Sequence, residues 1–118
     1  AAEYIAASGT LDIILCERGI RSFETATRFT MDLAVIELVR RETFLPVIVD
    51  PSHATGLASL VPSVALAAVA AGADGLLIEV HPRPDQALSD GPQSLTPAGF
   101  AELMENVRKV AQAVGTEV

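Results

Sequence analysis

The chain has 118 residues, half of them apolar, which is enough for one small domain and too short for two. Its formal net charge of −7 argues against a nucleic-acid partner, because such proteins present a basic face to the phosphate backbone. The single cysteine excludes an internal disulfide framework, and no apolar run approaches the length of a membrane span, so we expect a cytoplasmic protein with no membrane partner.

Three strand-and-helix units are predicted in chain order, after a leading helix at residues 1–7 that ends at Ser8-Gly9. Short β-branched runs indicate the strands, and apolar residues at helical spacing indicate the helices. The predicted strands cover residues 11–16, 45–50 and 75–80, and the predicted helices cover 31–41, 57–71 and 97–114. The strands recur at intervals of about 30 residues, which is typical of βαβ units and of parallel sheets.

Several local signals set the ends of these helices. Thr96-Pro97 is a typical helix start and Gly115 a typical stop for the last helix. Pro62 is compatible with the preceding helix only in its first turn or at a kink. Between strand and helix we expect a polar loop at 17–30 and a turn at the SHATG segment. The long loop at 82–97 is a candidate for a functional loop.

The fold class is therefore α/β. All three strands are apolar at successive positions, so both faces of the sheet favour burial, whereas the helices of three units would cover only one face. A complete (β/α)8 barrel takes about 250 residues. The chain is thus expected to be about three βα units of such a barrel with a leading helix, forming one partial domain over residues 1–118 and belonging to a longer protein.

Polar side chains gather where the three strands end, and in parallel α/β proteins ligands bind at that edge. His53, Glu79 and Asp90 come from three separate loops, and one imidazole with two carboxylates suits a divalent transition metal. A lone histidine after a strand is more often a hydrogen-bonded loop residue. Glu79 favours the metal, because an unpaired carboxylate inside the apolar run LLIEV would be costly to bury.

The basic residues after the first strand allow two interpretations. Arg18 either forms a surface ion pair with Glu17 or binds a phosphate or carboxylate through its forked guanidinium. Arg21 and Arg28 are expected to be solvated or paired. Cys16 is expected to be a small buried apolar residue rather than a ligand.

Three segments carry a resemblance to a known family: ILCERGIRSFETATR, LPVIVDPSHATG and ADGLLIEVHPRPDQALSDGPQSLTP. They resemble the C-terminal part of 3-deoxy-D-arabino-heptulosonate 7-phosphate (DAHP) synthases of the type I beta kind. The resemblance implies a (β/α)8 barrel, of which this chain would supply strands six to eight. It also implies a transferase that condenses phosphoenolpyruvate with erythrose 4-phosphate, the first step of the shikimate pathway to aromatic amino acids.

The motifs of this family imply roles for four residues. His53 of DPSH, Glu79 of EVHP and Asp90 of LSDGPQS would be catalytic ligands of a divalent metal ion such as Mn²⁺, Fe²⁺, Co²⁺ or Zn²⁺. Arg18 of CERG would bind the phosphate of phosphoenolpyruvate. The family's cysteine ligand on an early strand and its Lys-Pro-Arg-Thr segment are absent, and Phe29 stands where the family has Asn in ATRNT.

Two other functions stay open. One is the related 3-deoxy-octulosonate 8-phosphate synthase, which shares the barrel and an ERG motif, although CERGIR and DPSHATG favour the heptulosonate enzyme. The other is a non-catalytic half-barrel that acts only by association, since an exposed apolar sheet face would drive contact with another chain. We expect a homo-oligomer, and we expect the 118 residues alone to be inactive.

Overall fold

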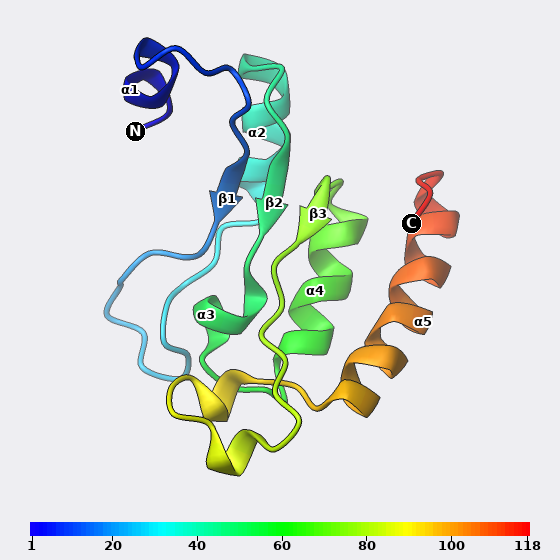
Figure 1. Ribbon diagram of the computed structural model, residues 1–118. Coiled ribbons are helices and arrows are strands. Elements are labelled where there is room, and N and C mark those ends of the chain that lie inside the picture. Colours follow the sequence, from blue (N-terminus) through cyan, green and yellow to red (C-terminus); the bar gives the residue numbers. More distant parts are fainter.

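In the computed structural model, which describes all of residues 1–118, three parallel strands lie side by side in the order β1-β2-β3 (Figure 1). Cys16 lies opposite Ile48, and Val49 opposite Leu76. All three strands run downwards in Figure 1, so their carboxyl ends meet at one edge. The strands are β1 (Leu15–Glu17), β2 (Val47–Val49) and β3 (Gly75–Leu76).

The strands are shorter than predicted because their outer residues have no neighbouring strand to pair with. Residues 11–14 precede the point where β1 meets β2, and β3 leaves the ladder after Leu76. Farther along, Val80 makes an isolated bridge to Leu95 instead.

The helices follow the predicted order with one addition. Each strand is followed by a longer helix, and a short extra helix comes directly after β2. The helices are α1 (Ala2–Ala7), α2 (Ala34–Glu42), α3 (Pro51–Thr55), α4 (Val61–Ala70) and α5 (Pro97–Val114), with 3₁₀ turns η1 (Pro84–Gln86) and η2 (Gly91–Gln93).

The helix-end signals are confirmed. Thr96 caps α5 by accepting a hydrogen bond from the Gly99 N–H at 3.1 Å, and Gly115 ends that helix with φ 80°. Pro62 lies in the first turn of α4, where its missing N–H costs nothing. The segment SHATG, expected as a turn, instead forms most of the short helix α3, because Asp50 caps the following backbone; the helix ends at Gly56.

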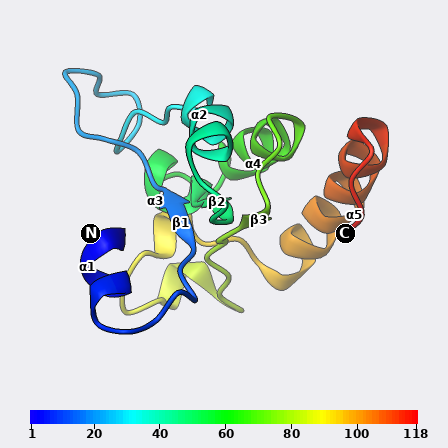
Figure 2. The same cartoon turned by 90° about the horizontal axis from the view of Figure 1, so that it is seen from above.

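The core lies on one side of the sheet. Ile36 of α2 packs with Val47 and Val49, and a second cluster joins Val61 of α4 to Leu103 of α5. Figure 2 shows α2 and α4 on the same side of the strands. The larger helices therefore cover the face on which Val47 and Val49 project.

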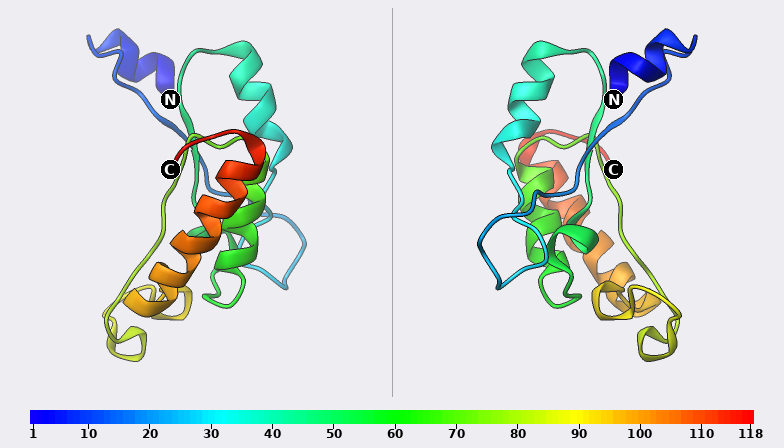
Figure 3. Two further views of the ribbon diagram at one scale, coloured as in Figure 1. Left: turned by 90° about the vertical axis from the view of Figure 1, so that its right-hand side faces the viewer. Right: turned by 90° about the vertical axis from the view of Figure 1, so that its left-hand side faces the viewer.

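Apolar residues next to the short strands are exposed to solvent. Ile14 is 61% exposed and Leu77 is 48% exposed, although both lie in predicted strands. Helix α1 contains no buried residue and stands apart from the other helices (Figure 3). None of the helices combines the length and the apolar character needed to cross a membrane.

Candidate functional site

The predicted site residues lie at the carboxyl edge of the sheet. Arg18 follows β1 directly, α3 with His53 follows β2, and Glu79 lies three residues beyond β3. In Figure 1 this edge is at the bottom, where α3, η1 and η2 gather. The parallel register thus places residues that are far apart in sequence on one rim.

Asp50 is the most buried charged residue of this rim, and the sequence analysis did not assign it a role. Its side chain is 0% exposed. One carboxylate oxygen, Oδ1, accepts the backbone N–H of His53 at 2.9 Å. The other, Oδ2, lies 2.7 Å from Nδ1 of the His53 imidazole. The Asp-Pro pair at a strand end is the sequence signal for this capping role.

The contact with Asp50 determines how His53 presents its other ring nitrogen. A proton on Nδ1 satisfies the Asp50 carboxylate, which leaves the lone pair of Nε2 free in the neutral ring. That Nε2 atom lies 3.5 Å from Oε1 of Glu79, a second acceptor. A divalent cation is one partner that two such facing acceptors can share. Carboxylate–imidazole pairs of this kind orient histidine ligands in metal sites.

Glu79 differs from the prediction in its burial. Its side chain is 39% exposed, so the expected cost of burying an unpaired carboxylate does not arise; that step of the sequence argument is wrong. The chain leaves the sheet after β3, and this opens the carboxylate to solvent. The backbone of Glu79 is held firmly, because its N–H donates to the Oγ of buried Ser52 at 3.0 Å.

Asp90 does not join His53 and Glu79. Its Oδ1 atom lies 3.5 Å from Nη1 of Arg28. No group of three or more His, Cys, Asp or Glu side chains lies close enough together to hold a metal ion. The donor types of His53 and Glu79 fit a divalent transition metal, and the full trio stays a prediction.

Arg18 pairs with Asp50 rather than with Glu17. Its Nε atom lies 3.4 Å from Oδ2 of Asp50, while 56% of its side chain is exposed. Glu17 instead accepts the backbone N–H of Gly19 at 3.0 Å, so the surface pair considered from sequence does not form. The rest of the Arg18 guanidinium is accessible to an anionic ligand.

Cys16 is exposed, and the prediction of a buried residue is wrong. It is the middle residue of β1, exposed between two partly buried neighbours. Partial desolvation of the thiol and the nearby charge of Asp50 raise the pKa of Cys16, against the opposing effect of Arg18. The thiol is therefore held in its protonated form at neutral pH.

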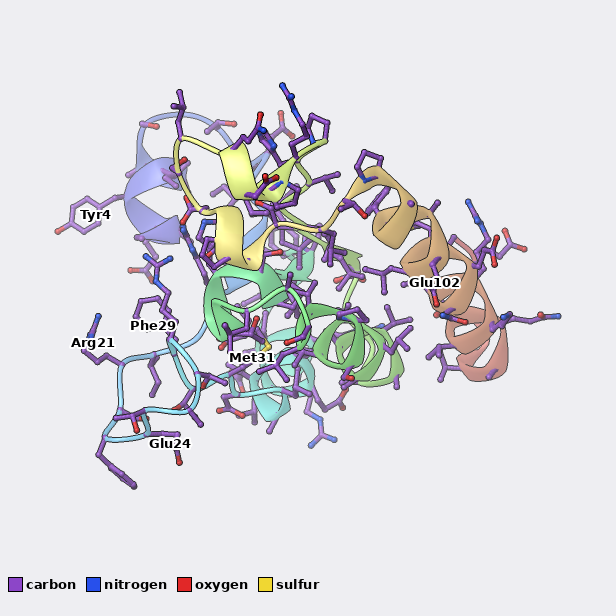
Figure 4. The ribbon with its side chains drawn as sticks, turned by 90° about the horizontal axis from the view of Figure 1, so that it is seen from below. Tyr4, Arg21, Glu24, Phe29, Met31 and Glu102 are labelled. Carbon is purple, nitrogen blue, oxygen red and sulfur yellow. The ribbon has the colours of Figure 1, made fainter.

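Two arginines flank one aromatic ring in the loop after β1. The guanidinium carbons of Arg21 and Arg28 lie 5.5 and 5.4 Å from the centre of the Phe29 ring. Figure 4 shows Arg21 and Phe29 on this loop. Arg28 is also paired with Asp90, which is one of the two states expected for it.

Comparisons with known proteins agree on one family. The family model described as the DAHP synthetase I family matches residues 1–115. The chain is 52% identical over 118 residues to a phospho-2-dehydro-3-deoxyheptonate aldolase of Thermotoga maritima, covering 100% of this chain and 35% of that protein. It is 39% identical to a 2-dehydro-3-deoxyphosphooctonate aldolase of Alkalilimnicola ehrlichii, covering 91% of this chain and 42% of the relative.

Solved structures give the same result for the fold. A truncated form of 3-deoxy-D-arabino-heptulosonate 7-phosphate synthase from Thermotoga maritima matches with a TM-score of 0.96 and 53% identity, over 99% of this chain and 45% of that chain. A crystal structure of the aldolase from the same organism matches with a TM-score of 0.97 over 99% of this chain and 35% of its own. The chain thus spans less than half the length of these relatives, and the prediction of a partial (β/α)8 barrel is confirmed.

Proposed function

This chain belongs to the DAHP synthetase I family, and on that premise we propose that it supplies part of the active site of a metal-dependent transferase. The reaction joins phosphoenolpyruvate to erythrose 4-phosphate, consumes water, and yields DAHP and inorganic phosphate. A new carbon–carbon bond forms between C3 of phosphoenolpyruvate and the aldehyde carbon. This condensation is the first step of the shikimate pathway.

The contact between His53 and Glu79 carries the proposal. Nε2 of His53 faces Oε1 of Glu79 at 3.5 Å, while Nδ1 is engaged by Asp50. His53, Glu79 and Asp90 would hold Mn²⁺, Fe²⁺, Co²⁺ or Zn²⁺, and such an ion polarises a carbonyl oxygen as a Lewis acid. Asp50 would keep the proton on Nδ1, so that Nε2 stays available as a ligand.

Arg18 would bind the phosphate of phosphoenolpyruvate. It lies at the carboxyl end of β1, on the same rim as His53, and both contact the Asp50 carboxylate. A guanidinium offers parallel N–H donors that match two phosphate oxygens. Asp50 fixes the Nε side of the group, so the remaining donors are pre-oriented for the anion.

Metal binding tests the ligand assignment directly. Calorimetry with Mn²⁺ is applied to the chain, to His53→Ala and to His81→Ala. His81 is the other histidine of the chain and accepts the backbone N–H of Arg83, so it is the matched control. Binding that is lost in His53→Ala and kept in His81→Ala would support the proposal, and equal binding by all three would contradict it.

A chimera tests the reaction. The 118 residues replace the matching segment of the Thermotoga maritima aldolase, with which they share 52% identity. A seven-carbon product requires a four-carbon aldose phosphate beside the three carbons of phosphoenolpyruvate, whereas an octulosonate requires a five-carbon one. Turnover of erythrose 4-phosphate supports the DAHP reaction, and preference for a pentose phosphate would favour the octulosonate alternative.

The proposal includes a homo-oligomer in the cytoplasm. Large apolar side chains such as Leu11, Phe44 and Leu77 are 70%, 85% and 48% exposed, and surfaces of this kind favour association. A lone cysteine is typical of proteins from a reducing compartment. Sedimentation velocity over a range of concentrations measures the association state, and a concentration-independent monomer would contradict this part.

A further inference from the structure

Arg28 joins two loops that are distant in sequence. Its Nη1 atom donates to Oε1 of Gln93 at 3.2 Å and lies 3.5 Å from Oδ1 of Asp90. Its backbone N–H donates to the carbonyl of Thr55, the last residue of α3, at 3.1 Å. One residue therefore links the helix that carries His53 to the loop that carries Asp90.

The path of Arg28 between these loops is narrowly defined. A Cβ atom on Gly56 would lie 2.9 Å from the Cβ of Arg28, so only glycine leaves room for this crossing. The neighbouring Phe29 donates its backbone N–H to the carbonyl of Ala54 at 2.8 Å. The Phe29 ring also lies against the Arg28 guanidinium, a favourable cation–π contact.

The loop on the other side depends on Arg28 in turn. Gln93 is only 2% exposed, and its Nε2 atom is buried without a partner, so the bond from Arg28 is important for this amide. Asp90 has φ 56°, and its backbone carbonyl accepts the hydroxyl of Ser94 at 2.9 Å. The backbone of Asp90 is thus set by its own turn, and Arg28 contacts one carboxylate oxygen while Oδ2 is left open.

We propose that Arg28 is a positioning residue that holds the Asp90 carboxylate on the rim shared with His53 and Glu79. Its Nη1 atom contacts both Gln93 and Asp90, and its backbone N–H is anchored on the last residue of α3. The role as a support for a metal ligand rests on the proposed function. The mechanical role, which is to hold the Asp90 loop against α3, is independent of any metal.

The test compares Arg28→Met with Arg21→Met in the 118-residue chain. Arg21 contacts the same Phe29 ring but makes no contact with Asp90, so it is the matched control. Amide hydrogen exchange of residues 89–94 is measured without metal, and Mn²⁺ affinity is measured by electron paramagnetic resonance. We expect faster exchange and a roughly 10–100-fold loss of affinity in Arg28→Met alone, the range typical for partners of metal ligands.

A second variant separates positioning from loss of stability. Arg28→Met leaves the buried Gln93 amide with no partner, which by itself destabilises the loop. In Arg28→Met/Gln93→Met that amide is removed, while the contact to Asp90 is still missing. The double variant should recover the melting temperature and keep the weak Mn²⁺ affinity; recovery of both would overturn the positioning role.

Hydrogen exchange and Mn²⁺ affinity together distinguish a failure of this inference from a failure of the proposed function. Unchanged exchange of residues 89–94 in Arg28→Met overturns the inference whether or not metal binds. Faster exchange with unchanged Mn²⁺ affinity overturns the role toward the metal ligand. If the wild-type chain binds no Mn²⁺ while exchange rises in Arg28→Met alone, the mechanical role is supported and the proposed metal site fails.

Discussion

Nδ1 of His53, in the five-residue helix α3, lies 2.7 Å from Oδ2 of Asp50, the residue that connects β2 to that helix. The same aspartate caps that helix through its other oxygen. A single buried carboxylate thus determines both the backbone turn and the orientation of the imidazole. The free ring nitrogen points at Glu79 for this reason.

Replacing Asp50 by Asn should reverse the proton arrangement on His53. The amide oxygen can still accept the backbone N–H, but the amide NH₂ would face Nδ1 and donate to it, which moves the ring proton to Nε2. We expect about a 10–100-fold loss of Mn²⁺ affinity, measured by calorimetry. Nitrogen chemical shifts of the imidazole report the tautomer, and Asp12→Asn, at an exposed position, is the control. Unchanged shifts would refute this account of Asp50.

Removing the hydroxyl of Ser52 should destabilise the chain. Ser52 is fully buried and accepts the backbone N–H of Glu79 at 3.0 Å. In Ser52→Ala that N–H loses its partner, and we expect the free energy of unfolding to fall by about 1–3 kcal/mol. Urea unfolding measures the change. Ser59→Ala, at an exposed position, should stay within about 0.5 kcal/mol of wild type.

Adding a methyl group at Gly56 should cost more than the backbone strain alone. Gly56 and Gly115 have similar left-handed φ values of 70° and 80°, but only Gly56 has Arg28 next to the new Cβ. Gly115→Ala measures the strain, about 1–2 kcal/mol. Gly56→Ala should lower the free energy of unfolding further and speed exchange in residues 89–94. Equal losses of unfolding free energy in the two variants would mean that Arg28 moves aside without a measurable cost in stability.

The alkylation of Cys16 should require a higher pH than that of an ordinary cysteine. Partial desolvation and the charge of Asp50 raise its pKa, so at a given pH a smaller fraction of the thiol is ionised than in the unfolded chain. Alkylation by iodoacetamide should therefore accelerate at higher pH in the folded chain than in the same chain unfolded in urea. Arg18→Gln removes the one lowering influence and should move the curve to still higher pH. A folded curve at or below the unfolded one would contradict this reasoning.

Local chemistry in the sequence determined much of the fold. The order of strands and helices, the limits of α5 between Thr96 and Gly115, and the place of Pro62 all follow from periodicity and capping within a few residues. These interactions are short-range, so they can be read without knowledge of the rest of the chain. The same holds for the positions of Arg18 and His53 after the first two strands, whereas Glu79 was expected within the third strand and lies three residues beyond it.

Only the tertiary structure decided which of these side chains meet. The Glu79 carboxylate is partly exposed instead of buried, because β3 ends three residues before Glu79. Asp50 caps α3 and orients the His53 imidazole, whereas its place at a strand end indicated only the capping. The contact of Arg28 with Asp90 spans 62 positions in the sequence, and no local pattern encodes it. Distances between loops depend on how parallel strands align and how helices pack, and those are properties of the whole fold.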